Sequence, residues 1–296
     1  MSFLDMDMWQ CAILHAPLKS IVQSHSLEDV EISFLPDAGD GRFLADPFGL
    51  WRDEKLYIFA ELYDYRTAKG EIEVFIYDRF FQLLERKTVL KEKWHLSYPY
   101  VFEHQGEVYM LPEGYKSGRL SLYRAVDFPF TWERVSQFDF PIGAIDATPL
   151  YHAGRWWLFW TPPTPKAYRQ SALHLALAEE LTGAWSDMGC ILVDPTGARP
   201  GGTPLVIDDK VVLPVQDCSR TYGGGIRFLQ FHEFGHGRPR LVAGPSLIAS
   251  SRLAREFPDG MHTLSAAGDV TLIDLKKIHY SLKPLLFSLK RRLGVK

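Results

Sequence analysis

The sequence predicts an all-β protein, a five-bladed β-propeller followed by a short C-terminal helix. Two observations support this prediction: pairs of short strands joined by a polar turn recur at a period of about fifty residues, and helical periodicity is absent before the C-terminal tail. The composition, 46% hydrophobic and 23% charged residues over 296 positions, is that of a globular chain with a sizeable core. We therefore expect one large β domain.

The repeated strand pairs keep a common internal spacing. Each begins at an Asp, Tyr or Gly, contains a Pro, turns at polar or glycine residues, and closes on a polar residue fifteen positions after its start. Four copies share this spacing: Asp46 to Glu61, Tyr98 to Glu113, Asp146 to Thr161, and Gly201 to Gln216. A fifth, shorter copy begins near His262, as is common for a terminal repeat.

Further strand candidates lie between the pairs, at residues 71–77, 119–125, 172–178 and 225–231. Pairs followed by additional strands, repeated five times, are typical of four-stranded blades around an axis. We expect a propeller over residues 1–275, with blade starts near 46, 98, 146, 201 and 262, and a separate tail over residues 276–296. The alternative is an irregular β-sandwich in which the Pro and Gly spacing is accidental.

Charge and cysteine content exclude several classes of function. A formal net charge of -3 provides no positive field for phosphates, so nucleic acid is not expected as a partner. The three cysteines are widely spaced and form no CxxC motif or Cys/His cluster, and we expect neither a metal nor a cofactor. The N-terminus does not resemble a signal peptide, and no apolar run approaches membrane-spanning length. These features predict a cytoplasmic protein.

Equivalent positions of the repeats should converge on the propeller axis, where the first strand of each blade opens onto one face. Four acidic side chains occupy such positions: Asp46, Glu61, Glu113 and Asp146. The alternative to a functional role is a structural one: an Asp before a Pro only starts a strand or turn, and a Glu after a Pro faces solvent. The candidate substrate-binding residues are Glu61, His95, Tyr98, Arg199, Gln216, Asp217 and His262. The aromatic side chains of Tyr98, Trp160 and Tyr222 near strand ends are candidates for stacking on sugar rings.

Several stretches resemble a known family. FLADPFGLW, WHLSYPYVFEHQGEVYMLPEG and AIDATPLYHAGRWWLFWT are similar to the N-terminal domain of glucosamine inositolphosphorylceramide transferases and its bacterial relatives. That domain is in turn similar to the five-bladed propellers of glycoside hydrolase family 43. The resemblance covers residues 40–275 and implies that Asp46 is a general base and that Asp146 orients and tunes a general acid.

The fourth blade departs from the pattern of the glycosidases. The resemblance implies a general-acid Glu there, within a Glu-Gly-Pro motif, but this sequence has Gly202-Thr203-Pro204. An inverting glycosidase needs an acid and a base on opposite sides of the scissile bond. Glu113 is the carboxylic acid that we nominate as the substitute.

Three functional hypotheses follow. The first is a glycosidase-like enzyme that cleaves or transfers a glycosyl unit, with Asp46, Asp146 and Glu113 as catalytic residues; the retained aspartates favour it. The second is a non-catalytic module that binds a glycan or glycoconjugate, and the third is a different reaction on a polar metabolite. The missing Glu favours these two. If mutual repulsion dominates the site, Asp46→Asn or Asp146→Asn should abolish ligand binding without lowering the melting temperature.

The tail is predicted to form a basic amphipathic helix. Leu285, Leu286, Leu289 and Leu293 recur at helical spacing, and the positive charges are Lys290, Arg291, Arg292 and Lys296. One interpretation is that the leucines dock onto the side of the propeller and the charges face water. The other is weak attachment to an anionic membrane surface.

Overall fold

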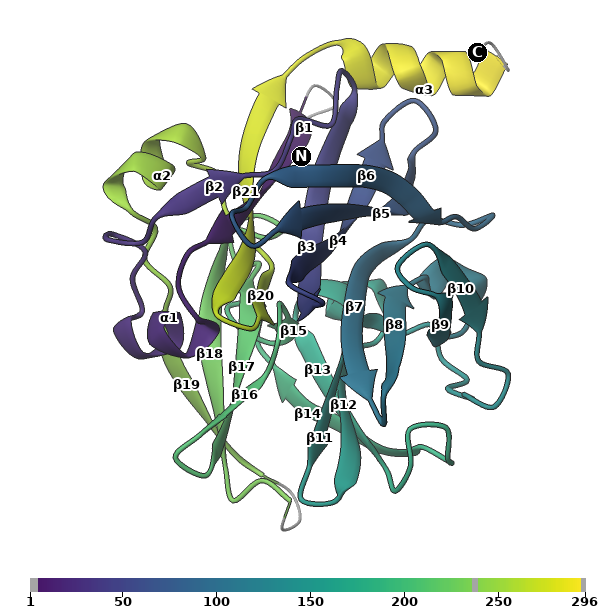
Figure 1. The fold of residues 1–296 in the computed structure, drawn as a ribbon, viewed down its shortest axis with the longest axis vertical. Coiled ribbons are helices and arrows are strands. Elements are labelled where there is room, and N and C mark those ends of the chain that lie inside the picture. Colours follow the sequence, from purple (N-terminus) through teal and green to yellow (C-terminus); the bar gives the residue numbers. More distant parts are fainter. Residues whose placement is uncertain (1–4, 236–238, 294–296) are drawn as a thin grey trace.

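The computed structural model describes residues 5–235 and 239–293 and is a five-bladed propeller. Five antiparallel sheets surround one axis, and a C-terminal helix lies at the edge of the ring (Figure 1). The predicted all-β class, the five blades and the short C-terminal helix are confirmed.

The first three blades are simple four-stranded meanders in chain order. Blade 1 contains β3 (Arg42–Arg52), β4 (Lys55–Asp64), β5 (Lys69–Asp78) and β6 (Leu83–Leu90). Blade 2 contains β7 (Ser97–His104), β8 (Glu107–Glu113), β9 (Tyr123–Asp127) and β10 (Thr131–Arg134). Blade 3 contains β11 (Ile145–His152), β12 (Arg155–Thr161), β13 (Ala172–Ala178) and β14 (Ser186–Val193).

Blade 4 has a divided first strand. The short strands β15 (Arg199–Pro200) and β16 (Leu205–Ile207) both pair with β17 (Lys210–Asp217), and β18 (Gly225–His232) and β19 (Arg240–Ser246) complete the sheet. Short helices lie in the connections between strands: α1 (Leu18–Ser24), η1 (Tyr115–Ser117), η2 (Lys166–Gln170) and α2 (Ser251–Glu256).

Blade 5 combines the two ends of the chain. Its strands are β20 (Leu264–Ala267), β21 (Val270–Tyr280), β1 (Asp5–Leu14) and β2 (Ile32–Phe34). β1 pairs with β21 over ten residues, from Asp5 opposite Tyr280 to Leu14 opposite Thr271. The fifth repeat has a shorter hairpin, as expected, and forms a complete blade because the N-terminal segment supplies its outer strands. For the same reason β21 continues past residue 275, where the propeller was expected to end.

A β-bulge marks the same place in each of the first three blades. The register shifts between Ala45 and Phe48 in blade 1, and at the equivalent points of blades 2 and 3. Asp46, Tyr98 and Asp146 occupy these bulges with φ values of 51°, 45° and 47°. Non-glycine residues adopt such positive φ values infrequently, and they are often found at functional sites. The bulges confirm that the three residues are structurally equivalent.

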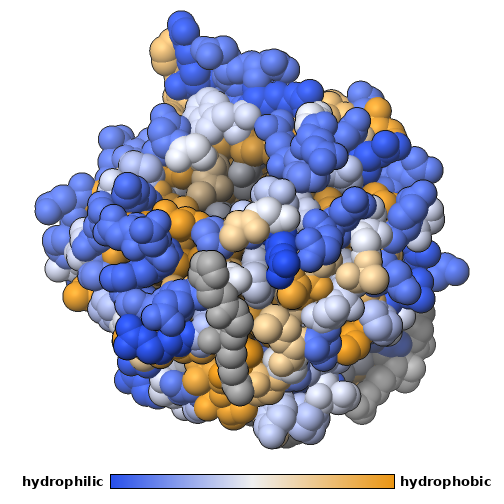
Figure 2. Space-filling view, turned by 90° about the horizontal axis from the view of Figure 1, so that it is seen from below, coloured by the Kyte–Doolittle hydropathy of each residue, from blue (hydrophilic) through white to orange (hydrophobic). Residues whose placement is uncertain are grey.

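Apolar side chains fill the spaces between neighbouring blades. The largest buried cluster joins blades 1, 2 and 3 and includes Phe48, Phe59 and Trp160. Trp160 is 1% exposed and packs edge-on against Phe140, so it belongs to the core and does not reach a ligand. On the face shown in Figure 2, hydrophilic and hydrophobic residues are interspersed. No helix in the described ranges is long and apolar enough to span a membrane.

The C-terminal helix α3 (Lys283–Leu293) differs from one expectation. Leu285, Leu286 and Leu289 are 42%, 56% and 55% exposed, so they do not dock onto the propeller. Phe287, on the opposite side of the helix, lies over Gly41 and makes the contact with blade 1 instead. Lys296 lies outside the described residues, as do the side chains of Arg292 and Leu293.

Because β1 closes the ring, truncating a core side chain of β1 should lower the free energy of unfolding by a large amount. Ile13 is 1% exposed and lies in the cluster between blades 5 and 1. We expect Ile13→Ala to lower the free energy of unfolding by about 2–4 kcal/mol in urea denaturation, since it creates a cavity in a packed core. The matched control Leu84→Ala, at a leucine that is 53% exposed, should change it by less than about 0.5 kcal/mol. Equal effects of the two changes would contradict this account of closure.

Candidate functional site

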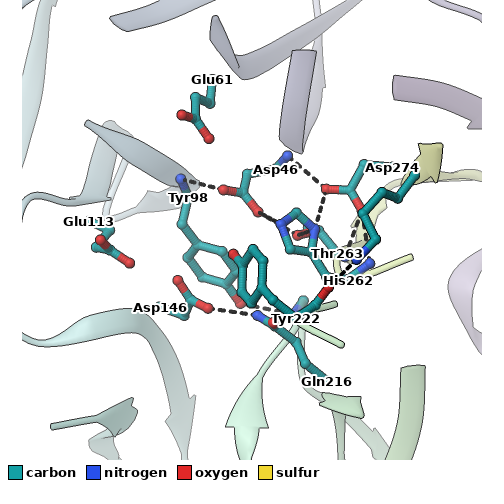
Figure 3. A network of polar contacts seen from close by, with 12 residues as sticks. Asp46, Glu61, Tyr98, Glu113, Asp146, Gln216, Tyr222, His262, Thr263 and Asp274 are labelled. Atoms are coloured by element: carbon teal, nitrogen blue, oxygen red, sulfur yellow. Dashed lines mark hydrogen bonds and ion pairs between the residues drawn. The ribbon is translucent and has the colours of Figure 1, made fainter. Parts of the chain in front are cut away.

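A cavity of about 730 Å³ opens on the axis at the centre of the blades. Its wall includes the carboxyl side chains Asp46, Glu61 and Glu113, all of them buried, together with Arg199 and His262. The other lining residues are Trp9, Phe43, Ala45, Tyr63, His95, Ser97, Tyr115, Ile145, Lys166, Ala167, Arg169, Gln170 and Tyr222. Figure 3 shows the acidic side chains arranged around a common centre, each from a different strand. Asp46 and Asp146 point toward this common centre from blades 1 and 3, as the repeat predicted (Figure 3).

Asp46 is held from three directions. Its Oδ2 accepts a hydrogen bond from the backbone N–H of Tyr98 (3.1 Å), and its Oδ1 accepts one from the hydroxyl of Thr263 (2.6 Å). Its own backbone N–H donates to Oδ2 of Asp274 (2.9 Å). Blades 1, 2 and 5 therefore fix the orientation of one carboxylate, which is the requirement for a group that reacts at a defined atom.

His262 forms a charged pair with Asp274 beside Asp46. Its Nδ1 lies 2.6 Å from Oδ2 of Asp274, and its Nε2 lies 3.7 Å from Oδ1 of Asp46 (Figure 3). Burial lowers the pKa of His262, but Asp274 and Asp46 outweigh burial and raise it above its usual value. Burial raises the pKa of Asp274, but His262 outweighs it and holds that pKa below its usual range. Burial raises the pKa of Asp46 to about 6, against the opposing effect of His262.

Asp46, His262 and Asp274 have ligand atoms within 4.8 Å of one another, a spacing that could hold a metal ion. The contacts also fit a proton-sharing network centred on the imidazole. Nδ1 of His262 lies 2.6 Å from a carboxylate oxygen of Asp274 and donates to it, and Nε2, which faces Asp46 at 3.7 Å, is the nitrogen that a metal ion would use.

Asp146 and Arg199 form a buried ion pair on the other side of the axis. Nε of Arg199 lies 2.6 Å from Oδ2 of Asp146, and Nε2 of Gln216 donates to the same oxygen at 2.7 Å. The guanidinium also lies 3.7 Å from Oε2 of Glu113 and over the ring of Tyr222. Arg199 therefore links blades 2, 3 and 4 through a single planar cation.

Glu113 and Glu61 are carboxylic acids that resist ionisation. Burial, and then the charge of Asp146, raises the pKa of Glu113 well above its usual value. Burial, and then the charge of Asp46, does the same for the pKa of Glu61. Acidic groups that converge in a low-dielectric site repel one another, so the protonated forms of both glutamates are favoured.

Glu61 faces His95 without bonding to it. Oε1 of Glu61 is buried and has no hydrogen-bond partner in the described part of the chain, and it lies 3.7 Å from Nε2 of His95. Nδ1 of His95 accepts from the backbone N–H of Gly70, and burial lowers the pKa of His95 to about 4. The imidazole is thus neutral with its proton on Nε2, aimed toward the carboxyl group of Glu61. A buried polar atom left unpaired in a cavity wall is available to a ligand.

Three predicted substrate-binding residues do not line the cavity. The hydroxyl of Tyr98 pairs with Thr148 and accepts the N–H of Gly202, so this residue joins blades behind the wall. Gln216 is fully buried against Asp146, and Asp217 accepts hydrogen bonds from Ser219 in a local turn. The other predicted site residues lie at or beside the cavity.

Sequence reasoning missed Asp274 and Trp9. Asp274 occupies in blade 5 the position that Glu61 and Glu113 hold in their blades, but the hairpin of blade 5 is shorter, and the fifteen-residue spacing does not reach it. Trp9 comes from β1, the strand that had not been assigned to a blade, and stacks on His262 at 3.8 Å between ring centroids. The pairing of β1 with the C-terminal strand β21 is the signal that could have found both residues.

Gly202 explains why the fourth blade lacks the general-acid Glu. Its φ of 146° is accessible to glycine and strained for other residues, and a Cβ atom there would lie 1.8 Å from the carbonyl oxygen of Leu264. The backbone of blade 4 therefore runs too close to blade 5 for any side chain at this position. The acid, if the site has one, comes from another blade.

Comparison with known proteins gives a family match and a set of relatives. Residues 32–267 match the family model described as glucosamine inositolphosphorylceramide transferase 1, N-terminal. The protein of that name from Oryza sativa subsp. indica is 34% identical over 247 residues, which are 78% of this chain and 33% of the relative. The protein from Arabidopsis thaliana is 30% identical over 235 residues, which are 77% and 31% of the two chains. The chain thus spans about a third of the length of the curated relatives it matches.

Solved structures share the fold at low identity. An α-L-arabinofuranosidase from Podospora anserina, in complex with cellotriose, superimposes with a TM-score of 0.61 at 11% identity, covering 79% of this chain and 81% of that one. The catalytic domain of a family 62 α-L-arabinofuranosidase from Coprinopsis cinerea gives 0.58 at 10% identity, covering 78% and 90%. An exo-β-1,3-galactanase from Phanerochaete chrysosporium gives 0.53 at 12% identity, covering 73% and 54%. Likeness at this level supports the propeller fold.

The raised pKa of Asp46 predicts a pH-dependent effect of Asp46→Asn. A carboxyl group whose pKa rises from 3.8 to about 6 on folding stabilises the protein below pH 3.8, and that stability is lost as the pH rises through 6. The difference in unfolding free energy between variant and wild type should therefore move in favour of the variant by about 2–3 kcal/mol from pH 4 to pH 7. Denaturation at both pH values measures it. Asp208→Asn is the matched control, at an exposed position with a similar φ of 48°. A constant difference across this range would contradict the assignment.

The ion pair revises the expectation for Asp146→Asn, which was that the melting temperature would not fall. Loss of the carboxylate 2.6 Å from Nε leaves Glu113, at 3.7 Å, as the nearest carboxyl group to the buried charge of Arg199. We expect the free energy of unfolding to fall by about 3 kcal/mol, as when one partner of a buried pair is removed. Adding Arg199→Gln to the variant should recover part of the loss in a thermal melt. A wild-type melting temperature for Asp146→Asn would show that the pair contributes nothing.

Proposed function

The chain belongs to the N-terminal family of glucosamine inositolphosphorylceramide transferase 1, and from this membership together with the axial site we propose that it is a carbohydrate-active enzyme that cleaves or transfers a glycosyl unit. The matched relatives are about three times as long as the matched segment, so the proposal concerns the propeller and its own site. The substrate class is a glycan or glycoconjugate.

One observation carries the proposal: two buried carboxyl groups of the cavity wall lie in environments that raise their pKa values to different extents. The pKa of Asp46, which has His262 beside it, rises to about 6, so this group is ionised at neutral pH. Burial and the charge of Asp146 raise the pKa of Glu113 well above its usual value, which favours its protonated form. Two carboxyl groups whose environments move their pKa values apart are the arrangement that general base and general acid catalysis of glycosyl transfer requires.

In the proposed reaction the oxygen of a water molecule or of an acceptor hydroxyl attacks the anomeric carbon. Asp46 accepts the proton that this oxygen loses. The bond between the anomeric carbon and the glycosidic oxygen breaks, and Glu113 gives its proton to the departing oxygen. One proton enters the site at Asp46 and one leaves it at Glu113, so the protein returns to its starting state by exchanging them with solvent. Attack by water gives hydrolysis, and attack by a sugar or lipid hydroxyl gives transfer.

Asp146 and Arg199 are positioning residues in this scheme. Asp146 is fixed by Arg199 and Gln216, and its charge raises the pKa of Glu113. Arg199, 3.7 Å from Glu113, stabilises that side chain once its proton has gone. This division supports the roles that the family resemblance implies for Asp46 and Asp146, with Glu113 as the acid in place of the missing fourth-blade Glu.

The remaining wall suits a sugar ring. Phe43 and Tyr63 stack at 4.8 Å between centroids, and Trp9, His262 and Tyr222 form a second aromatic group in the same cavity wall. Aromatic faces pack against the apolar faces of sugars, while the unpaired Oε1 of Glu61 offers an acceptor for a hydroxyl group. Glu61 is therefore proposed to bind substrate.

The absence of a side chain at Gly202 favours a second candidate, a non-catalytic glycan-binding propeller. The two candidates differ in turnover. Incubation of the protein with a panel of oligosaccharides and glycoconjugates, followed by NMR of the anomeric protons and calorimetric titration, separates them. New anomeric signals support the enzyme, and binding without turnover supports the module. The absence of both binding and turnover would reject a carbohydrate function.

The assignment of Glu113 as acid makes a sharper prediction. Glu113→Gln keeps the shape of the side chain but cannot donate the proton, so turnover should fall by about 10²–10⁴-fold while the Kd for the same glycan stays within about threefold. Glu107→Gln, an exposed change on the same strand, is the control and should leave both values unchanged. Full turnover in Glu113→Gln would exclude this residue as the acid.

A further inference from the structure

Helix α3 carries its apolar side on the outside of the molecule. Leu285, Leu286 and Leu289 share one side of the helix at intervals of one, three and four residues, and Leu282 continues that side just before it. Leu282 is 64% exposed and Tyr280 is 81% exposed. Elsewhere in the described residues one other close group of exposed apolar side chains occurs, Phe80, Leu83 and Leu84 at the turn into β6, and the rest are more widely spread along the chain. A continuous apolar surface of this kind marks an interaction site.

The opposite side of α3 fixes the helix to blade 1. Phe287 lies over Gly41, Lys283 forms an ion pair with Asp40, and Arg291 donates to the backbone oxygen of Tyr65. In a surface helix the apolar side ordinarily packs on the core and the polar side faces water. Here the contacts hold the polar side inward, so the exposed leucines are a consequence of how the helix is anchored.

The segment that ends the chain is strongly basic. From Leu275 to Lys296 the sequence contains seven Lys or Arg residues and no Asp or Glu; of these, Lys276 is buried and Lys283 is paired with Asp40, so the others supply the excess positive charge. Apolar side chains flanked by excess positive charge complement one kind of surface in particular, a bilayer with anionic headgroups, where the leucines enter the interface and the cations remain at headgroup level. An acidic protein groove would match the charge but is not needed to explain the breadth of the apolar side.

The helix lies on the same end of the propeller as the cavity mouth. The exposed part of the cavity wall is in η2, which connects the second and third strands of blade 3. Tyr65, to which Arg291 binds, begins the equivalent connection of blade 1. Tyr65 also contacts Tyr63 and Phe43 of the cavity wall, at 5.0 and 5.9 Å between ring centroids. Only one aromatic layer separates α3 from the site.

We infer that α3 attaches the protein to an anionic membrane surface and turns the cavity mouth toward that surface. The leucine side of the helix inserts at the level of the headgroups, and blade 1 sets the orientation of the ring. A site held in this way receives a glycosyl group carried on a lipid from the membrane itself. Membrane attachment can be measured without a glycan, so its test stands apart from the proposed glycosyl chemistry.

Co-sedimentation with vesicles tests the attachment. The full chain should bind vesicles of phosphatidylcholine with 30% phosphatidylserine at low salt, and should bind at least about tenfold less to phosphatidylcholine alone or in 0.5 M NaCl, because the attraction of basic residues is screened. Leu286→Glu with Leu289→Glu should lower binding to the anionic vesicles by about tenfold or more. The matched control is Leu84→Glu with Val126→Glu, at side chains that are 53% and 52% exposed, and it should bind as the wild type does.

Three results would overturn the inference. The wild type could fail to bind anionic vesicles at low salt, or the α3 double variant could bind them as well as the control variant does. The third is self-association: sedimentation velocity would show a dimer of the full chain that the α3 double variant abolishes, which would make the leucines a contact between two copies.

The orientation has its own measurement. A fluorophore on Lys166→Cys at the cavity mouth, in a Cys190→Ser background, should be quenched by vesicles containing brominated lipid. The same label on Gln105→Cys, in the exposed turn between β7 and β8 at the other end of a blade, should not. Equal quenching at both positions would overturn the orientation.

Discussion

The pairing of β1 with β21 closes the ring of blades, and the axial site exists only in a closed ring. Ten residues from each end of the described chain form this ladder, so the last blade is complete only when β1 has paired with β21. The same pairing places Trp9 against His262 and brings Asp274 to the backbone of Asp46. Core packing between blades and the chemistry at the centre thus depend on one contact between residues more than 250 positions apart.

Within that ring the main problem is charge. Five buried carboxyl groups, Asp46, Glu61, Glu113, Asp146 and Asp274, share a small volume with two cationic partners, Arg199 and His262. Burial without compensation would cost several kcal/mol for each ion, so the site divides the groups into ion pairs and protonated acids. Asp146 and Asp274 take the ion pairs, while burial raises the pKa values of Glu61 and Glu113 and favours their protonated forms. The resulting separation of pKa values has a chemical use, and it arises from the same energetics that keep the protein folded.

The repeat in the sequence predicted the blades and the convergence of Asp46, Asp146 and Glu113, because equal spacing in a propeller means equal distance from the axis. It could not reveal Asp274, since the shortened hairpin of blade 5 breaks the spacing. It also missed β1, because pairing between distant strands leaves no local periodicity. In α3 the spacing of Leu285 and Leu289 identified residues on one side of a helix. Which side faces the protein was decided by Phe287 and Gly41, a contact that periodicity does not encode.

Tyr98 sets a limit on what can enter the site. Its ring packs against Phe48 of blade 1, and its hydroxyl joins Thr148 of blade 3 and Gly202 of blade 4, so a single side chain from blade 2 crosses the axis and plugs the channel. The propeller is consequently a blind well and not a tunnel. A polysaccharide cannot be threaded through it, because the plug closes the channel behind the carboxyl groups of the cavity wall. Such a well favours the terminal unit of a chain or a single branch, with the rest of the molecule remaining outside.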